Sequence, residues 1–164
     1  MTGVQTCALP IYLRAAVTGA RLVFDVVASK GFREVARALG DLLTPDQLVV
    51  HATKGLEVGT HARMTEVLAE ETCARQVGVL SGPNIANEIV AGLPAGTVVA
   101  SRFPRVRDEA TRALASPRFR VFHNDDVLGV ELAGAFKNVV AIAAGVAHGL
   151  GLGENAKAML VARG

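Results

Sequence analysis

Short apolar runs alternate with amphipathic stretches along most of the chain, and this alternation constrains the fold more than any other feature. Five runs have the length and composition of buried strands: 22–27, 48–52, 77–81, 97–100 and 119–122. The stretches that follow the first four runs carry apolar residues at helical spacing: 32–43, 60–68, 84–91 and 106–115. Thr60 is expected to cap the second of these helices. Strands that alternate with helices of about ten residues predict an α/β sheet, mostly parallel in its early part.

A long apolar segment follows the last predicted strand. Asp125 or Asp126 can cap a helix over 127–150, and a second helix is expected over 154–163. The longer helix approaches the ~20 residues that a membrane span requires. Charged and polar residues interrupt it: Glu131, Lys137, Asn138 and His148. Because a central Lys alone costs about 2.5–3.5 kcal/mol on insertion, we predict no membrane span but a helix buried between layers or between subunits.

Composition excludes several classes of protein. The 164 residues are 51% hydrophobic, and 17 Lys and Arg against 15 Asp and Glu give a net charge of +2, which excludes intrinsic disorder. The small charge and 4% aromatic residues argue against a nucleic-acid partner. Cys7 and Cys73 show no disulfide or metal pattern, so we expect a reducing, cytoplasmic location.

Two loops directly follow predicted strands, where open α/β sheets bind their ligands. In the first, ATKGLE (52–57), Lys54 can pair with a phosphate, although a solvated loop lysine has the same pattern. In the second, SGPNIANE (81–88), Gly82 permits close backbone approach, and free N–H groups from Asn84 to Ala86 can bind an anion at a helix N-terminus. The alternative is an ordinary turn between a strand and a helix.

Lys137 lies within the long apolar helix. A buried lysine loses solvation, which lowers its pKa and lets it donate or accept a proton. The alternatives are a lysine that extends to solvent at the helix edge, or one paired with Glu131. Glu131 precedes it by six residues rather than three or four, so a pair on one helix face is not favoured. The histidines have no metal-ligand spacing, no Ser-His-Asp order is plausible, and we predict no metal site.

Four stretches, in order, resemble bacterial NAD(P)-dependent glycerol-3-phosphate dehydrogenase over about residues 14–164. They are ATKGLE (52–57), LSGPNIANE (80–88), GVELAGAFKNVVAIAAG (129–145) and GLGLGENAKA (149–158). The resemblance implies reduction of dihydroxyacetone phosphate to sn-glycerol 3-phosphate with NADH or NADPH, for glycerophospholipid synthesis. It implies the second half of a Rossmann-like domain followed by helices of an all-α domain. It also implies a small phosphate substrate and a homodimer.

The resemblance also implies roles for single residues. Lys137 is similar to the catalytic general acid/base and also contacts substrate, and Lys54 is similar to a lysine that contacts substrate and cofactor. Gly82 and Asn84 align with substrate-binding positions, and Ala86 aligns with a cofactor contact. Asn84 departs from the Ser that is common in the family but keeps hydrogen-bonding capacity.

Parts of the family pattern are absent from this sequence. No G-x-G-x-x-G follows an early strand, and the downstream Ser-Arg-Asn segment is missing. We therefore expect a central fragment that does not turn over alone, with a partial dinucleotide-binding domain at 12–124 and the start of a helical substrate domain at 125–164. Residues 1–11 have no helical or strand period and resemble a translated sequencing adapter, so we expect them to be non-native.

Two other functions stay open from the sequence. One is a different dehydrogenase of the 6-phosphogluconate/β-hydroxyacid dehydrogenase-like superfamily, whose lysine helix typically has the pattern G-x-x-x-K-x-x-N. Here Gly134-x-x-Lys137-Asn138 differs from that pattern. The other is a non-catalytic remnant that kept the fold.

Overall fold

The structure, a computed structural model, describes residues 12–164, so the predictions on residues 1–11 and Cys7 lie outside the described residues. Helices and strands alternate through the first two thirds of the chain, as the sequence predicts. The elements are α1 (Leu13–Val17), β1 (Leu22–Asp25), a 3-10 turn η2 (Ser29–Gly31), α2 (Phe32–Gly40), β2 (Leu48–His51), α3 (Met64–Glu71), β3 (Gln76–Ser81), α4 (Ala86–Val90), β4 (Ala95–Ala100), α5 (Pro104–Leu114), β5 (Phe119–Asn124), α6 (Val127–Gly149) and α7 (Gly153–Arg163).

The five strands form one sheet in the order β1-β2-β3-β4-β5. Strands β1, β2 and β3 are mutually parallel, β4 runs antiparallel to β3, and β5 is parallel to β4. The predicted α/β class and the early parallel part are confirmed. Because the carboxyl ends of β1, β2 and β3 share one edge of the sheet, the loops that follow them lie close together.

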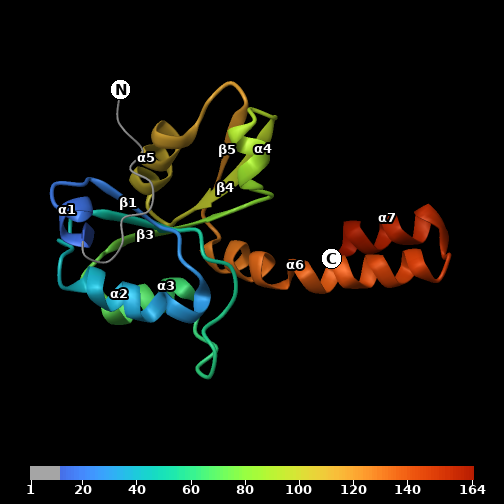
Figure 1. The fold of residues 1–164 in the computed structure, drawn as a ribbon, viewed down its shortest axis with the longest axis horizontal. Coiled ribbons are helices and arrows are strands. Elements are labelled where there is room, and N and C mark those ends of the chain that lie inside the picture. Colours follow the sequence, from blue (N-terminus) through green and yellow to red (C-terminus); the bar gives the residue numbers. More distant parts are fainter. Residues whose placement is uncertain (1–11) are drawn as a thin grey trace.

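Helices cover both faces of the sheet (Figure 1). One core cluster joins α1, α2 and α3 to the sheet face that carries Val49, and a second joins α5 to the face that carries Leu48 and Val50. These neighbours on β2 face opposite ways because side chains alternate along a strand. All four residues of β2 are buried, which explains the apolar run from Leu48 to Val50, and the strand ends at the buried His51.

Helix α6 leaves the sheet and runs away from it, and α7 folds back along it (Figure 1). Asp126 caps α6 by accepting a 2.8 Å hydrogen bond from the Gly129 N–H, which confirms one of the two predicted caps. Among residues 12–164, α6 is the one helix long and apolar enough to cross a membrane, judged by length and composition alone.

The expected burial of α6 is not found within the described residues. Its apolar side chains are largely exposed, among them Phe136, Val139 and Ile142, and on α7 Met159 is exposed as well. The helix extends beyond the sheet domain (Figure 1). Its first turns contact the sheet, and α7 packs along the rest of it. The sequence pattern correctly marked an apolar surface but not what covers it.

The predicted cap at Thr60 is wrong. Helix α3 begins at Met64 with Arg63 as its cap residue. Thr60 instead donates a 2.5 Å hydrogen bond to the Glu57 carboxylate, within a turn that the Glu57 N–H closes on the Ala62 carbonyl. This local turn uses the hydroxyl that a cap would need.

Candidate active site

Two of the predicted site residues meet at the carboxyl edge of the parallel strands. Lys54 follows β2, Gly82 follows β3, and Lys54 Nζ donates a 2.9 Å hydrogen bond to the Gly82 carbonyl. Gly55 has a φ of 110°, a conformation that favours glycine and that turns the chain directly after Lys54. The structure therefore places the lysine of the first loop over the backbone of the second.

Gly82 lies too close to β4 for any side chain. A Cβ atom there would lie 2.9 Å from the Gly96 carbonyl oxygen and 3.0 Å from Thr97 Cα. Both neighbours are backbone atoms of a packed strand and cannot move easily. The predicted close backbone approach at Gly82 is present, but it is made to β4.

Asn84 is used differently from the prediction. Its N–H is not free, because it donates to the Gly82 carbonyl at 2.9 Å. Its Nδ2 donates to Thr97 Oγ1 at 3.0 Å, and its Oδ1 is buried without a partner among the described residues. The side chain thus ties the turn to β4 in this structure.

The helix after this turn is shorter than predicted. It covers Ala86–Val90 instead of 84–91, and Ala86, its first residue, is exposed. Five residues align few peptide dipoles, so the expected anion site at this helix N-terminus has little support. Ala86 remains close in sequence to the turn that carries Gly82.

Lys137 is exposed in the structure, so the prediction of a buried lysine is wrong. The titration argument applies instead to Lys54, because partial burial and then the positive charge of Lys137 lower its pKa. Helix α6 approaches this lysine at Gly134, where a Cβ atom would lie 3.0 Å from Ser81 Oγ and 3.8 Å from Lys54 Cγ. The absence of a side chain at Gly134 lets α6 bring Lys137 towards Lys54.

Glu131 is the polar residue of the site region whose role the sequence did not reveal. It is 8% exposed, and its carboxylate accepts hydrogen bonds from Arg63 Nη1 (2.7 Å), the Thr65 N–H (2.9 Å) and Thr65 Oγ1 (2.7 Å). His51 Nε2, at the end of β2, lies 3.1 Å from the same carboxylate. A glutamate in an apolar helix needs such donors, and that need is the signal in the sequence. From the sequence only Lys137 is weighed as its partner, whereas the structure supplies Arg63, Thr65 and His51.

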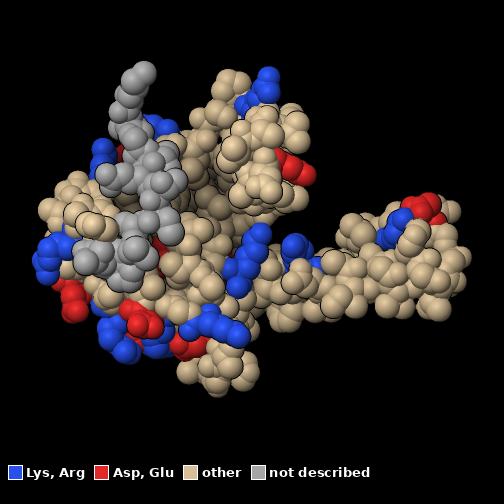
Figure 2. Space-filling model, in the orientation of Figure 1, with Lys and Arg blue, Asp and Glu red and all other residues tan. Residues whose placement is uncertain are grey.

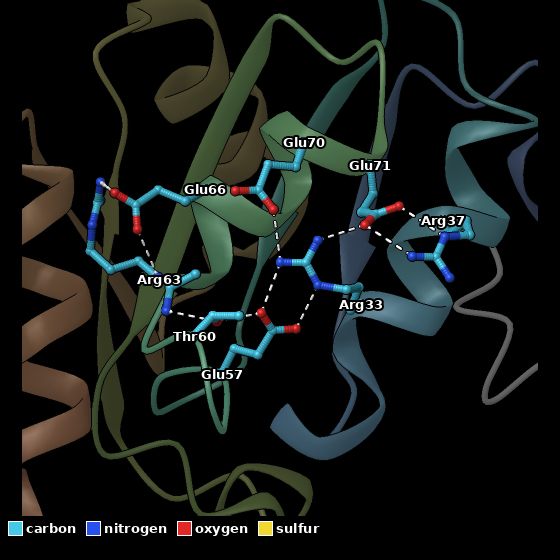
Figure 3. Close-up of polar contacts among 9 residues, drawn as sticks. Arg33, Arg37, Glu57, Thr60, Arg63, Glu66, Glu70 and Glu71 are labelled. Atoms are coloured by element: carbon cyan, nitrogen blue, oxygen red, sulfur yellow. Dashed lines mark hydrogen bonds and ion pairs between the residues drawn. The ribbon is translucent and has the colours of Figure 1, made fainter.

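A charged network braces the loop that carries Lys54. Arg33 on α2 contacts Glu57 in that loop with two nitrogens, at 2.6 and 2.8 Å, and also reaches Glu70 and Glu71 on α3 (Figure 3). The hydrogen bonds from Arg33 and then from Thr60 lower the pKa of Glu57 to about 2. The paired, planar geometry of an arginine and a carboxylate fixes orientation, so the network holds the loop against α2 and α3.

The site is basic. Figure 2 shows basic side chains on the face where α6 leaves the sheet. Within the described part of the chain, no group of three or more His, Cys, Asp and Glu side chains could hold a metal ion. The structure brings together the ammonium groups of Lys54 and Lys137 and the backbone of the turn at Gly82. These groups suit an anionic, phosphorylated ligand.

Comparisons with known proteins identify the family of this chain. Residues 7–106 match the family model "NAD-dependent glycerol-3-phosphate dehydrogenase N-terminus", and residues 126–164 match the corresponding C-terminus model. A glycerol-3-phosphate dehydrogenase [NAD(P)+] of Acinetobacter baylyi is 46% identical over 92% of this chain. The alignment covers 42% of that relative, so the chain spans less than half of its length.

Solved structures give the same result. A glycerol-3-phosphate dehydrogenase from Coxiella burnetii is 39% identical, with a TM-score of 0.78 over 92% of this chain and 46% of that one. A ketopantoate reductase from Ralstonia eutropha is 19% identical, with a TM-score of 0.52 over 74% of this chain and 39% of its own, and shares the fold alone. The chain belongs to the NAD-dependent glycerol-3-phosphate dehydrogenase family.

Proposed function

We propose that this chain forms part of an enzyme that reduces dihydroxyacetone phosphate to sn-glycerol 3-phosphate with NADH or NADPH. The observation that carries the proposal is the arrangement of Lys54 against Gly82, with Lys137 brought near by α6. The curated dehydrogenases that it resembles are named for glycerol 3-phosphate, the product of this reaction, and for NAD(P)+. In such an enzyme the product supplies the backbone of glycerophospholipids.

The charges of the site suit each part of this reaction. A ketone that receives a hydride develops negative charge on its oxygen and needs a proton. Lys137, exposed on α6, donates that proton as the catalytic acid, and Lys54 binds the substrate phosphate and the cofactor. Burial and then the positive charge of Lys137 lower the pKa of Lys54, and no carboxylate pairs with it among the described residues, so a phosphate bound here would stabilise its ammonium form.

The carboxyl edge of β1, β2 and β3 fits a dinucleotide. It offers the backbone of Gly82 and Ala86, and it lies where open parallel sheets bind such cofactors. The nicotinamide, when bound, supplies the hydride. Gly82 and Asn84 shape the substrate side of the same turn, Gly82 through its backbone and Asn84 by holding the turn to β4.

The exposed apolar surface of α6 and α7 supports an assembly with further protein, which we place in the cytoplasm. Side chains such as Phe136 and Ile142 are more than half exposed, and contiguous apolar surface of this kind is normally covered by protein. We assign the covering to further helices of the same enzyme and to a second copy in a homodimer, with no segment spanning a membrane.

A chimera tests the function. Residues 12–164 replace the matching segment of the Acinetobacter baylyi relative, and NADH or NADPH oxidation is followed with dihydroxyacetone phosphate. We expect turnover that Lys137→Met lowers by about 10²-fold or more, because a general acid contributes about 10²–10⁴-fold. The matched control Lys157→Met, on α7, should retain activity. A folded chimera that is inactive, or that prefers a β-hydroxyacid and its ketone as substrate and product, would overturn the assignment.

A further inference from the structure

The first turns of α6 attach to the sheet domain through one buried carboxylate. Glu131 Oε1 faces His51 Nε2 and the Thr65 N–H, and Oε2 faces Arg63 Nη1 and Thr65 Oγ1. Across residues 12–164, these contacts are the side-chain hydrogen bonds that join α6 to another element. The contacts reach two elements, because His51 ends β2 while Arg63 and Thr65 begin α3.

The geometry of this cluster defines an orientation as well as a contact. Each carboxylate oxygen meets two groups, so rotating or sliding α6 breaks several contacts together. The Thr65 N–H belongs to the first turn of α3, where the helix dipole favours a negative charge. Burial raises the pKa of Glu131, but the hydrogen bonds from His51 and Thr65 outweigh burial, and the pKa falls below its ordinary value.

Stability alone does not explain a buried charged cluster. Replacing buried ion pairs by apolar residues of similar volume is often neutral or stabilising. An apolar contact would constrain the rotation of the helix less than these hydrogen bonds do, because the hydrophobic effect is non-directional. What a fully satisfied carboxylate adds is a fixed angle for the helix that it holds.

That angle sets the position of Lys137. Six residues separate it from Glu131, a rise of about 9 Å along the helix. Between Glu131 and Lys137, Gly134 brings α6 close to Ser81 and Lys54 of the sheet domain. Because α6 has 23 residues, a small rotation at its base displaces the atoms farther along the helix.

We propose that Glu131 is a positioning residue: by holding α6 to the end of β2 and the start of α3, it sets Lys137 opposite Lys54. The proposal rests on the proposed function for its catalytic consequence. The orientation of α6 is independent of that function and can be measured separately.

The first experiment measures orientation in the 164-residue chain. Spin labels at Ala113→Cys on α5 and Ala141→Cys on α6, with Cys7→Ser and Cys73→Ser, report the distance between the sheet domain and α6 by electron paramagnetic resonance. We expect Glu131→Gln, which keeps shape but removes charge, to broaden and shift the distance distribution. The control Glu154→Gln, an exposed carboxylate on α7, should not. Unchanged distributions for a folded Glu131→Gln chain would overturn the proposal.

A second, milder variant tests the same proposal if the Glu131→Gln chain does not fold. Thr65→Val removes the hydroxyl that contacts Glu131 and Arg63 and keeps the backbone N–H that donates to Glu131. We expect a smaller change in the same direction, with the sheet domain folded by circular dichroism. A folded Thr65→Val chain with the parent distribution would also count against the proposal.

The catalytic consequence is measured in the chimera. We expect Glu131→Gln to lower kcat about 10- to 100-fold while KM for the nicotinamide stays within about twofold, because misplacement by about 1 Å can cost 10²-fold in rate. An unchanged kcat would overturn the positioning role. Inactivity of the parent chimera would instead reject the proposed function and leave the distance measurement to decide the orientation.

Discussion

Asp25 offers a quantitative test of what an ionised, buried carboxylate costs the stability of the sheet domain. It ends β1, is 4% exposed, and its Oδ2 has no hydrogen-bond partner among the described residues. Burial raises its pKa from the usual 3.8 to about 6, against a smaller opposing effect of His51. The folded chain therefore binds the proton more tightly than the unfolded chain, and stability is lost as the pH rises from 3.8 to about 6.

The size of this loss follows from the two pKa values. At about 1.36 kcal/mol per pKa unit, the ionised Asp25 costs about 3 kcal/mol above pH 6. Asp25→Asn, which keeps the shape without the charge, should stabilise the chain by about 3 kcal/mol near pH 7.5. The gain should shrink to about 1.5 kcal/mol near pH 5, where the folded wild type is mostly protonated.

Urea unfolding followed by circular dichroism at both pH values measures this difference. Asp108→Asn, at an exposed position on α5, is the control and should leave stability unchanged at either pH. A gain from Asp25→Asn that is equal at the two pH values would refute the argument, because a pH-independent gain cannot come from the charge.

Three further substitutions test the core and the site. Phe32→Ala, at a side chain 1% exposed and packed edge-on against His51, should lower the free energy of unfolding by about 3–5 kcal/mol; a loss below about 1 kcal/mol in urea would contradict the assigned core. Gly82→Ala places a Cβ 2.9 Å from the Gly96 carbonyl, and thermal melting should show a clear drop that Gly145→Ala, which meets open space, does not cause. Lys54→Met in the chimera should raise KM for dihydroxyacetone phosphate about tenfold or more, because hydrogen bonds to charged groups contribute about 1.5–3 kcal/mol; an unchanged KM would remove Lys54 from the phosphate site.

The sequence predicted the strands and the long helix well because their signals are local. The apolar run at β2 is buried as a whole, and the Asp126 cap lies directly before α6. The prediction at Thr60 failed because a competing turn, closed through Glu57, uses the same hydroxyl. Local patterns do not reveal which of two nearby acceptors a short side chain will choose.

The site was predictable in part. The positions of Lys54 and Gly82 after parallel strands follow from topology alone, and the structure brings them to 2.9 Å. The exposure of Lys137 and the contacts of Glu131 depend on the angle at which α6 meets the sheet, and that angle is set by residues 66 to 80 positions earlier in the chain. Helical periodicity predicts a face, not the element that the face meets.

A crystal structure of the chimera with bound glycerol 3-phosphate tests the central claim most directly. The account predicts that the ligand lies over the Gly82 turn, with its phosphate within hydrogen-bond distance of Lys54 and its secondary hydroxyl within reach of Lys137. Ligand bound away from both lysines, or bound identically after Lys54 and Lys137 are replaced, would contradict it.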